Sequence, residues 1–344
     1  MNHQEQPIVK SVRDLGLQFL ENDVNITGQD GITSILLPDG RTFWVFGDTI
    51  EGPFDTIRYH PLAEVLSNTG AIVPLQDLSN GIWQFEHLKS PDGKRPRQLI
   101  HFLPHEDKAL HRLWAIHGAC VEDHLYLFYH KITMDPVKDV FEAFALNGMG
   151  IARSDLARFE FERLKAPDGS YEFWKGDEPG FGVFIQEEGD YLYLWGSLDK
   201  AMFLARVRPQ AIEELSAYEY LVQAPTLEHP DLKPRWSLTF SPSAPLFDHV
   251  PNEMSCSYNP YLGSFISLTT FEREDKLVIR TAPEITGPWG PPEVFYRPPK
   301  AKEDSLFNAG KEHPEFSRLG GKIIYMTYID SSVYVPHLLE ITLR

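Results

Sequence analysis

Two aspartates, Asp30 and Asp48, lie at equal distances from one tight turn and could act together as a catalytic pair. Residues 38–40 read Pro-Asp-Gly, which is a turn sequence, and apolar runs flank them on both sides. In an antiparallel hairpin built on this turn, Asp30 is expected directly opposite Asp48. Opposed residues have Cβ atoms roughly 4.5–5.5 Å apart, so both carboxyl groups would occupy one site.

Two carboxylates at this spacing repel each other, and one of them commonly keeps a proton at a raised pKa. A protonated and an ionised carboxyl group are what cleavage of a glycosidic bond requires. A simpler interpretation has Asp48 binding the amides of the following turn and Asp30 capping the strand entry. A change of one residue in the turn would also separate the pair. We predict that Asp30 and Asp48 are catalytic, with either one as the acid.

The elements that must position these acids are predicted to be strands. Short runs of β-branched and aromatic residues alternate with turn residues along the chain. Hairpin turns recur near residues 39, 123, 188, 261 and 320, about 70 residues apart, and most hairpins are followed by a further strand. A two-layer β-sandwich explains the hairpins but not these outer strands. The pattern therefore predicts an all-β protein, a five-bladed β-propeller forming a single domain over residues 1–344.

The blades are expected near residues 27–75, 110–165, 180–222, 250–297 and 310–343. Residues 8–15 are expected to supply the outer strand of the last blade and close the ring, because an open sheet edge is a liability. The innermost strand of the fifth blade is expected at residues 313–316. Residues 209–221, which begin with proline, could form one short helix.

Polar residues are expected to gather at one mouth of this propeller, where inner strands begin and second strands end. Each could be structural on its own, but together they predict a funnel for a hydroxyl-rich ligand, an oligosaccharide or glycoside substrate. The predicted substrate contacts are His117, His130, Glu253, Glu312, His313 and Asp330. Tryptophans could stack on sugar rings, although strand alternation explains Trp44, Trp114 and Trp195 as core residues.

The composition of the chain argues against several classes of binding partner and cofactor. The formal charge of −17 over 344 residues argues against nucleic acid or an anionic membrane surface as a partner. No apolar run reaches the length of a membrane span. Cys120 and Cys256 are the only cysteines, and no zinc-binding pattern is present, so we expect no metal and no cofactor. The oligomeric state stays open.

The first residues lack the basic and apolar regions of a signal peptide. A cytoplasmic location is therefore expected if Met1 is the natural start, and secretion if a leader has been removed.

Several motifs resemble those of the five-bladed β-propeller glycoside hydrolases, the group that holds arabinanases, xylosidases and fructan-processing enzymes. The chain is most similar to a formerly uncharacterised propeller family whose characterised members are endo-hydrolases of D-arabinan. The motifs lie between residues 28 and 328. They are Gly28-Gln29-Asp30-Gly31, Trp44-Val45-Phe46-Gly47-Asp48-Thr49, Ser257-Tyr258-Asn259-Pro260-Tyr261-Leu262-Gly263, Gly287-Pro288-Trp289, His313-Pro314-Glu315-Phe316 and Tyr325-Met326-Thr327-Tyr328.

The resemblance implies a hydrolase acting on furanosides or related sugars, with Asp30 and Asp48 as the matching catalytic carboxylates. Other propeller glycosidases take the acid from a later blade, which makes Glu253 or Glu312 the reserve candidate. The resemblance also implies an inverting reaction without a required metal, although some relatives hold a cation in the channel.

The chain departs from that family in showing no export signal, so it would act on short imported oligosaccharides or have another specificity. A catalytically silent carbohydrate-binding propeller is one alternative function. An intracellular glycoside phosphorylase is another, and it would need Arg or Lys in the funnel, for which Lys131 is the obvious candidate.

Overall fold

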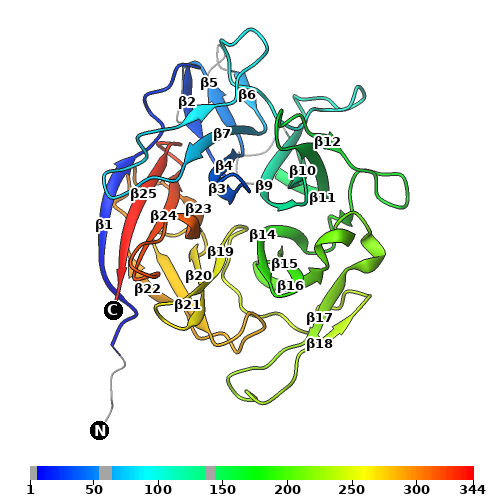
Figure 1. Ribbon diagram of the computed structural model, residues 1–344, viewed down its shortest axis with the longest axis vertical. Coiled ribbons are helices and arrows are strands. Elements are labelled where there is room, and N and C mark those ends of the chain that lie inside the picture. The colour runs from blue at the N-terminus through cyan, green and yellow to red at the C-terminus, as the bar shows by residue number, and fades with distance from the viewer. Residues whose placement is uncertain (1–5, 54–63, 136–143) are drawn as a thin grey trace.

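Five β-sheets surround a central axis, as the computed structural model shows for residues 6–53, 64–135 and 144–344 (Figure 1). In four of these sheets the first strand in chain order lies nearest the axis and the later strands follow outward; in the fifth, β23 is innermost and β1 is outermost. This arrangement confirms the predicted five-bladed β-propeller. The innermost strands are β3 (Thr33–Leu36), β9 (His111–Val121), β14 (Gly180–Glu188), β19 (Ser255–Asn259) and β23 (Phe307–Glu312).

The first two blades each carry strands beyond the usual four. The first comprises β3, β4 (Arg41–Phe46), β7 (Thr69–Pro74) and β8 (Glu86–His87), and beside it β2 (Ile26–Gln29), β5 (Thr49–Glu51) and β6 (Glu64–Leu66) form a smaller sheet. The second comprises β9, β10 (His124–Met134), β11 (Phe144–Asp155) and β12 (Glu162–Arg163), with β13 (Trp174–Lys175) paired to β11.

The remaining three blades follow in chain order. The third contains β14, β15 (Tyr191–Leu198), β16 (Ala201–Val207), β17 (Glu219–Gln223) and β18 (Arg235–Ser237). The fourth contains β19, β20 (Ser264–Thr270), β21 (Leu277–Ala282) and β22 (Glu293–Tyr296). The fifth contains β23, β24 (Ile323–Asp330), β25 (Pro336–Leu343) and β1 (Val9–Leu17).

Strand β1 closes the ring, as expected from the sequence. It pairs antiparallel with β25, and Val12 lies opposite Ile341. The innermost and outermost strands of the fifth blade thus come from opposite ends of the chain (Figure 1).

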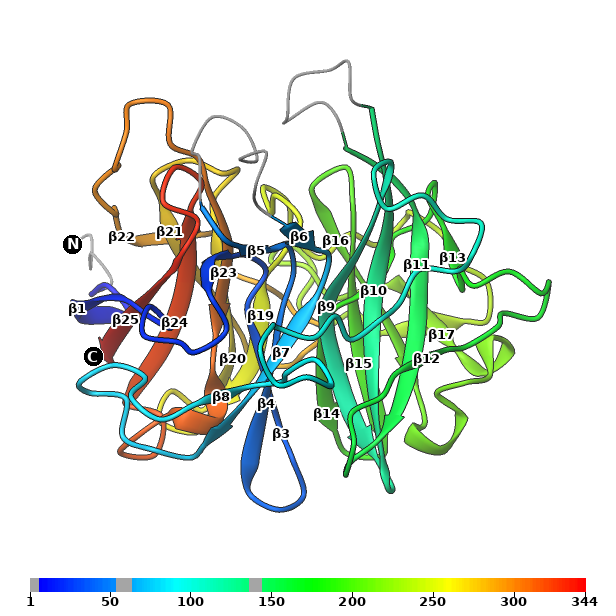
Figure 2. The ribbon, with the colours of Figure 1, turned by 90° about the horizontal axis from the view of Figure 1, so that it is seen from above.

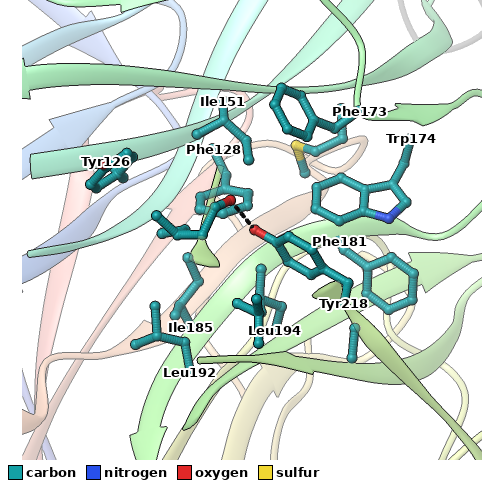
Figure 3. Close-up of a cluster of buried hydrophobic side chains, with 14 of the residues drawn as sticks. Tyr126, Phe128, Ile151, Phe173, Trp174, Phe181, Ile185, Leu192, Leu194 and Tyr218 are labelled. Carbon is teal, nitrogen blue, oxygen red and sulfur yellow. Dashed lines mark hydrogen bonds between the residues drawn. The ribbon is translucent and has the colours of Figure 1, made fainter. Parts of the chain in front are cut away.

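Aromatic and aliphatic side chains fill the space between neighbouring blades. Between the second and third blades, Phe128 and Trp174 meet Phe181 in a buried cluster (Figure 3). Tyr218 lies in the same cluster, and its hydroxyl donates to the carbonyl of Ile212 at 2.6 Å, so no polar group is left unpaired there. Alternating strand residues thus bury one face of each sheet against the next blade.

Two local expectations were wrong. Residues 209–221 form no α-helix but two short 3₁₀ turns, Pro209–Ala211 and Leu215–Ala217, before β17 begins. The innermost strand of the fifth blade is β23, Phe307–Glu312, and Pro314–Phe316 is a 3₁₀ turn at its far end. In the described part of the chain, no helix is long and apolar enough to span a membrane.

The first hairpin has the predicted register. Ser34 faces Trp44 and Leu36 faces Thr42 in β3 and β4, and the same register continues at Gln29 and Thr49 in β2 and β5. The ladder is interrupted between these two pairs of strands. There Asp30 N–H donates to the carbonyl of Asp48 at 3.1 Å.

Candidate functional site

A pocket of about 920 Å³, counting its open mouth, lies at the end of the propeller where the innermost strands begin. The β3–β4 turn points to the opposite end of the molecule (Figure 2). The pocket is lined by Asp30, Gly31, Gly47, Asp48, Trp114, Ile116, Phe144, Pro251, Asn252, Glu253, Arg273, Leu306, Asn308, Ala309, Ser331 and Tyr334.

Asp30 reaches this pocket because the chain kinks just after β2. Its carboxylate accepts hydrogen bonds from the Gly31 amide at 2.6 Å and from the Asn308 side-chain amide at 2.8 Å. Removal from water and the negative charge of Glu253 outweigh these bonds and raise the pKa of Asp30 to about 6. Asp30 therefore holds a proton in mildly acidic solution.

Asp48 lies across the hairpin from Asp30 in a different electrostatic setting. Trp114 Nε1 donates to Asp48 Oδ1 at 2.8 Å, and Arg112 Nε is 3.5 Å from the same oxygen. An N–H donor and a guanidinium both favour a negatively charged carboxylate. The hairpin thus presents two carboxyl groups in one pocket, Asp48 beside an indole N–H and a guanidinium, and Asp30 beside amide donors and the charge of Glu253.

Glu253 also lines the pocket, just before β19, and is paired with a buried lysine. Lys311 Nζ is 2.6 Å from Glu253 Oε2, and it also donates to Thr33 Oγ1 and to the carbonyl of Ile116. This ammonium group thus holds the Glu253 carboxylate at the pocket wall.

Aromatic side chains form part of the same wall. The rings of Trp114 and Phe144 pack edge to face, with centroids 5.1 Å apart. Trp114 therefore belongs to the pocket, in contrast to its sequence-based interpretation as a core residue. An indole at this position can pack against a sugar ring while its N–H holds Asp48.

The histidines expected at the mouth lie deeper in the molecule. His117 is in the middle of β9 because this strand begins at His111, six residues earlier. His130 is four residues from the end of β10, against Gly180 of β14. Both are buried, and burial lowers the pKa of His117 to about 3 and of His130 to about 4. Neither lines the pocket, so their predicted placement was wrong.

Glu312 and His313 are also absent from the pocket wall, because they end β23 rather than begin an inner strand. Ser257 Oγ donates to Glu312 Oε2 at 2.6 Å, and burial raises the pKa of Glu312 to about 7. His313 is fully buried, stacks on Trp44 and bonds Ser34 and Thr327 through its two ring nitrogens. Glu312 therefore does not line this pocket, and its role as the reserve acid stays a prediction.

Asp330 lies near the mouth, but its carboxylate is used within the protein. It accepts hydrogen bonds from the amides of Ala301 and Ser332 and from the Ser332 hydroxyl. Burial alone would raise the pKa of Asp330, but these bonds keep it below its usual value. The expected substrate contact is thus a carboxylate that anchors loops.

Lys131, the candidate for holding phosphate, is likewise engaged elsewhere. Its ammonium group is 2.9 Å from Glu106 and 3.0 Å from Glu172, and it does not line the pocket. Across the residues that the structure describes, no three His, Cys, Asp or Glu side chains are grouped as metal ligands.

Several polar residues of the pocket were missed from the sequence, among them Asn308 and Arg273. Asn308 is the second residue of β23, so placing the fifth inner strand at residues 313–316 hid it. Arg273 lies in the loop between β20 and β21, where no strand pattern marks its direction. Only the expectation that the loop between β20 and β21 lies at the mouth of the propeller could have predicted Arg273 as a pocket residue.

Residues 20–334 match a protein family described as "Domain of unknown function (DUF4185)". This match covers the propeller almost completely. The chain belongs to the DUF4185 family. No curated protein matches the sequence.

Solved structures share the fold of this DUF4185 protein at low sequence identity. A Bacteroides ovatus protein that carries the provisional description of a hydrolase aligns with a TM-score of 0.66 and 14% identity, covering 93% of this chain and 87% of that one. A GH43_1 enzyme of Xanthomonas citri aligns with a TM-score of 0.55 and 12% identity, covering 95% of this chain and 91% of that one. The same enzyme has also been solved with xylose and with xylotriose.

An exo-β-1,3-galactanase of Phanerochaete chrysosporium, solved with β-1,3-galactotriose, aligns with a TM-score of 0.52 and 10% identity. The alignment covers 96% of this chain and 64% of that one. At these identities the likeness establishes the fold, the five-bladed propeller, and leaves the chemistry to the pocket itself.

Proposed function

We propose that this DUF4185 protein is a glycoside hydrolase in which Asp30 is the general acid and Asp48 the general base. The observation that carries the proposal is the contrast between the two carboxyl groups. The pKa of Asp30 is raised to about 6, whereas Asp48 accepts from Trp114 and lies beside Arg112. Glycosidic cleavage uses one protonated and one ionised carboxyl group in this way.

The substrate proposed from the sequence resemblance is a furanoside or a related glycan, with arabinan oligosaccharides as the first to test. Both aromatic and polar groups line the pocket, which suits a sugar that has an apolar face and a rim of hydroxyls. Structural neighbours that hold xylotriose and galactotriose support an oligosaccharide in such a propeller.

The test is a comparison of the wild type with Asp30→Asn and Asp48→Asn on arabinan, xylan and fructan oligosaccharides and on aryl glycosides. Each substitution is expected to lower kcat/KM by about 10²–10⁴-fold on natural linkages, because each removes a proton-transfer group. On nitrophenyl glycosides, whose leaving group needs no protonation, Asp30→Asn is expected to keep much more activity than Asp48→Asn.

Unchanged activity in both variants would contradict the catalytic pair. Sugar binding by the wild type without turnover of any substrate would instead favour a carbohydrate-binding propeller. Circular dichroism and melting temperatures of the three proteins check that each variant is folded.

A further inference from the structure

Arg273 lies at the pocket on a loop whose backbone is held from two sides. The loop joins β20 to β21, and Phe271 N–H donates to the carbonyl of Lys276 at 2.8 Å. The carbonyl of Arg273 accepts from the amide of Phe307, at the start of β23, at 3.0 Å. These bonds tie the loop to the neighbouring blade, so the base of the Arg273 side chain has a fixed position at the pocket.

The acidic residues beside Arg273 are all engaged with other cations. Glu272 pairs with His249 and Lys200, Glu274 with Lys276, and Asp275 with Arg297. Among the described residues, Arg273 has no carboxylate within salt-bridge distance. With the side-chain amide of Asn252, another pocket residue, turned so that its oxygen faces Arg273, the guanidinium donates to that oxygen at 2.9 Å.

The three carboxylates of the pocket also have partners within the protein. Asp48 lies beside Arg112, Glu253 pairs with Lys311, and Asp30 accepts from Asn308. In a chain with a net charge of −17, the arginine that lines the pocket thus has no carboxylate partner among the residues that the structure describes. A guanidinium presents a planar fork of N–H donors that matches the two oxygens of a carboxylate or phosphate.

We propose that Arg273 binds an oxyanion, a carboxylate or a phosphate, of the ligand that occupies this pocket. This inference deepens the proposed hydrolase function, on which it rests for the cleavage step: the glycan cleaved here carries a carboxylate or a phosphate that reaches Arg273. Charge recognition by Arg273 then selects acidic over neutral substrates.

The test measures binding by calorimetry in the Asp30→Asn background, where turnover is suppressed. The probes are glucose, glucuronic acid, galacturonic acid, glucose 6-phosphate and inorganic phosphate. At least one anionic probe is expected to bind roughly 10-fold or more tightly than glucose, the range of a hydrogen bond to a charged group. Adding Arg273→Gln should abolish this preference, and Arg273→Lys should keep only part of it, because a lysine retains the charge without the fork.

Arg297→Gln is the matched control, because Arg297 is exposed, carries the same charge and pairs with Asp275 outside the pocket. It should leave the preference intact. Tight binding of the uronic acids would identify the oxyanion as the carboxylate of a sugar. Tight binding of glucose 6-phosphate would identify it as the phosphate of a sugar. Tight binding of inorganic phosphate alone would identify it as a free ion and overturn the assignment to a glycan. Equal binding of glucose and every anionic probe, or a preference that survives Arg273→Gln, would overturn the proposal.

Failure of this proposal and failure of the hydrolase proposal are distinguishable. If Arg273 contacts only neutral hydroxyls, the aspartate variants still lose hydrolysis of neutral glycosides. If the protein is no hydrolase, the charge preference is still measured, because the binding assay requires no turnover.

Discussion

At the scale of single residues, the pocket places three carboxyl groups in three electrostatic environments. Asp48 has an indole N–H and a guanidinium, Glu253 has an ammonium group, and Asp30 has only amide donors. Asp30, which has no cationic partner among these contacts, has a raised pKa. In the proposed mechanism, the surroundings of each carboxyl group therefore decide which one donates the proton.

The charge of Glu253 contributes to the raised pKa of Asp30, which predicts a shift in the pH–rate profile of a Glu253→Gln variant. A general acid is active in its protonated form, so kcat/KM of the wild type should fall as the pH rises through about 6. Removing the negative charge lowers the pKa of Asp30. The basic limb of the Glu253→Gln profile should therefore move to lower pH.

Glu188→Gln is the control, since Glu188 is an exposed acid at the far end of β14. Its profile should coincide with that of the wild type. A basic limb that stays in place or moves to higher pH in Glu253→Gln would show that Asp30 is not the titrating acid.

At the scale of elements, the kink at Asp30 depends on Gly31. Gly31 has a φ of +59°, in the left-handed region, and an added Cβ would lie 3.3 Å from the Gly47 amide nitrogen. This kink interrupts the hairpin ladder between β2 and β3. It turns the Asp30 carboxylate into the pocket rather than along a regular strand.

Gly31→Ala is expected to cost about 1–2 kcal/mol of unfolding free energy, because a side chain strains a left-handed backbone. It should also lower kcat/KM, because the strain is relieved by moving Asp30. Urea unfolding and steady-state kinetics measure the two effects.

Gly40→Ala separates these effects, because Gly40 also has a positive φ, +84°, but lies in the β3–β4 turn with open space around its Cβ position. It should lose a similar amount of stability and keep its activity. An equal loss of activity in both variants would mean that the kink has no specific role.

The elements predicted from the sequence are those with strong local patterns. The turn at residues 38–40 fixed the register of the first hairpin and hence the opposition of Asp30 and Asp48. The fifth inner strand was misplaced because Phe307–Glu312 contains Asn, Gly, Lys and Glu, which lack a strand pattern. These polar residues are tolerated there because they face the pocket and channel, where Asn308 and Lys311 bond other blades. In this strand, the residues that line the pocket and the channel thus depart from the alternating pattern by which strands are recognised in a sequence.

At the scale of the whole molecule, ionisable side chains are buried along the propeller axis. Glu312, His117, His130 and His313 are each less than a tenth exposed. The histidines have lowered pKa values, so they stay neutral while unfolded histidines gain protons below about pH 6.5. Their contribution to stability is therefore lost as the pH falls from about 6.5.

Glu312 acts in the opposite sense. Its pKa in the folded state is raised to about 7 from a usual 4.5, so folding favours its protonated form. Its contribution to stability is present at low pH and is lost as the pH rises from about 4.5 through 7. Glu312→Gln, which resembles the protonated side chain, should change the melting temperature little at pH 5. At pH 8 it should raise the melting temperature above that of the wild type.

Melting curves of both proteins across this range test the prediction, with Glu188→Gln as the exposed counterpart. The difference between Glu312→Gln and the wild type should grow with pH, whereas the Glu188→Gln difference should stay constant. A Glu312→Gln difference that is independent of pH would show that Glu312 is already ionised in the folded protein.

The pairing of β1 with β25 has a consequence for synthesis on the ribosome. The partner of Val9 is Leu343, so β1 finds its place only after the 334 residues that follow Val9 up to Leu343 have been made. At about 5–20 residues per second, this interval lasts roughly 15–65 s. During that time β1 is an unpaired strand and the fifth blade cannot be completed. The newly made chain therefore depends on whatever shields its first strand until the last one arrives.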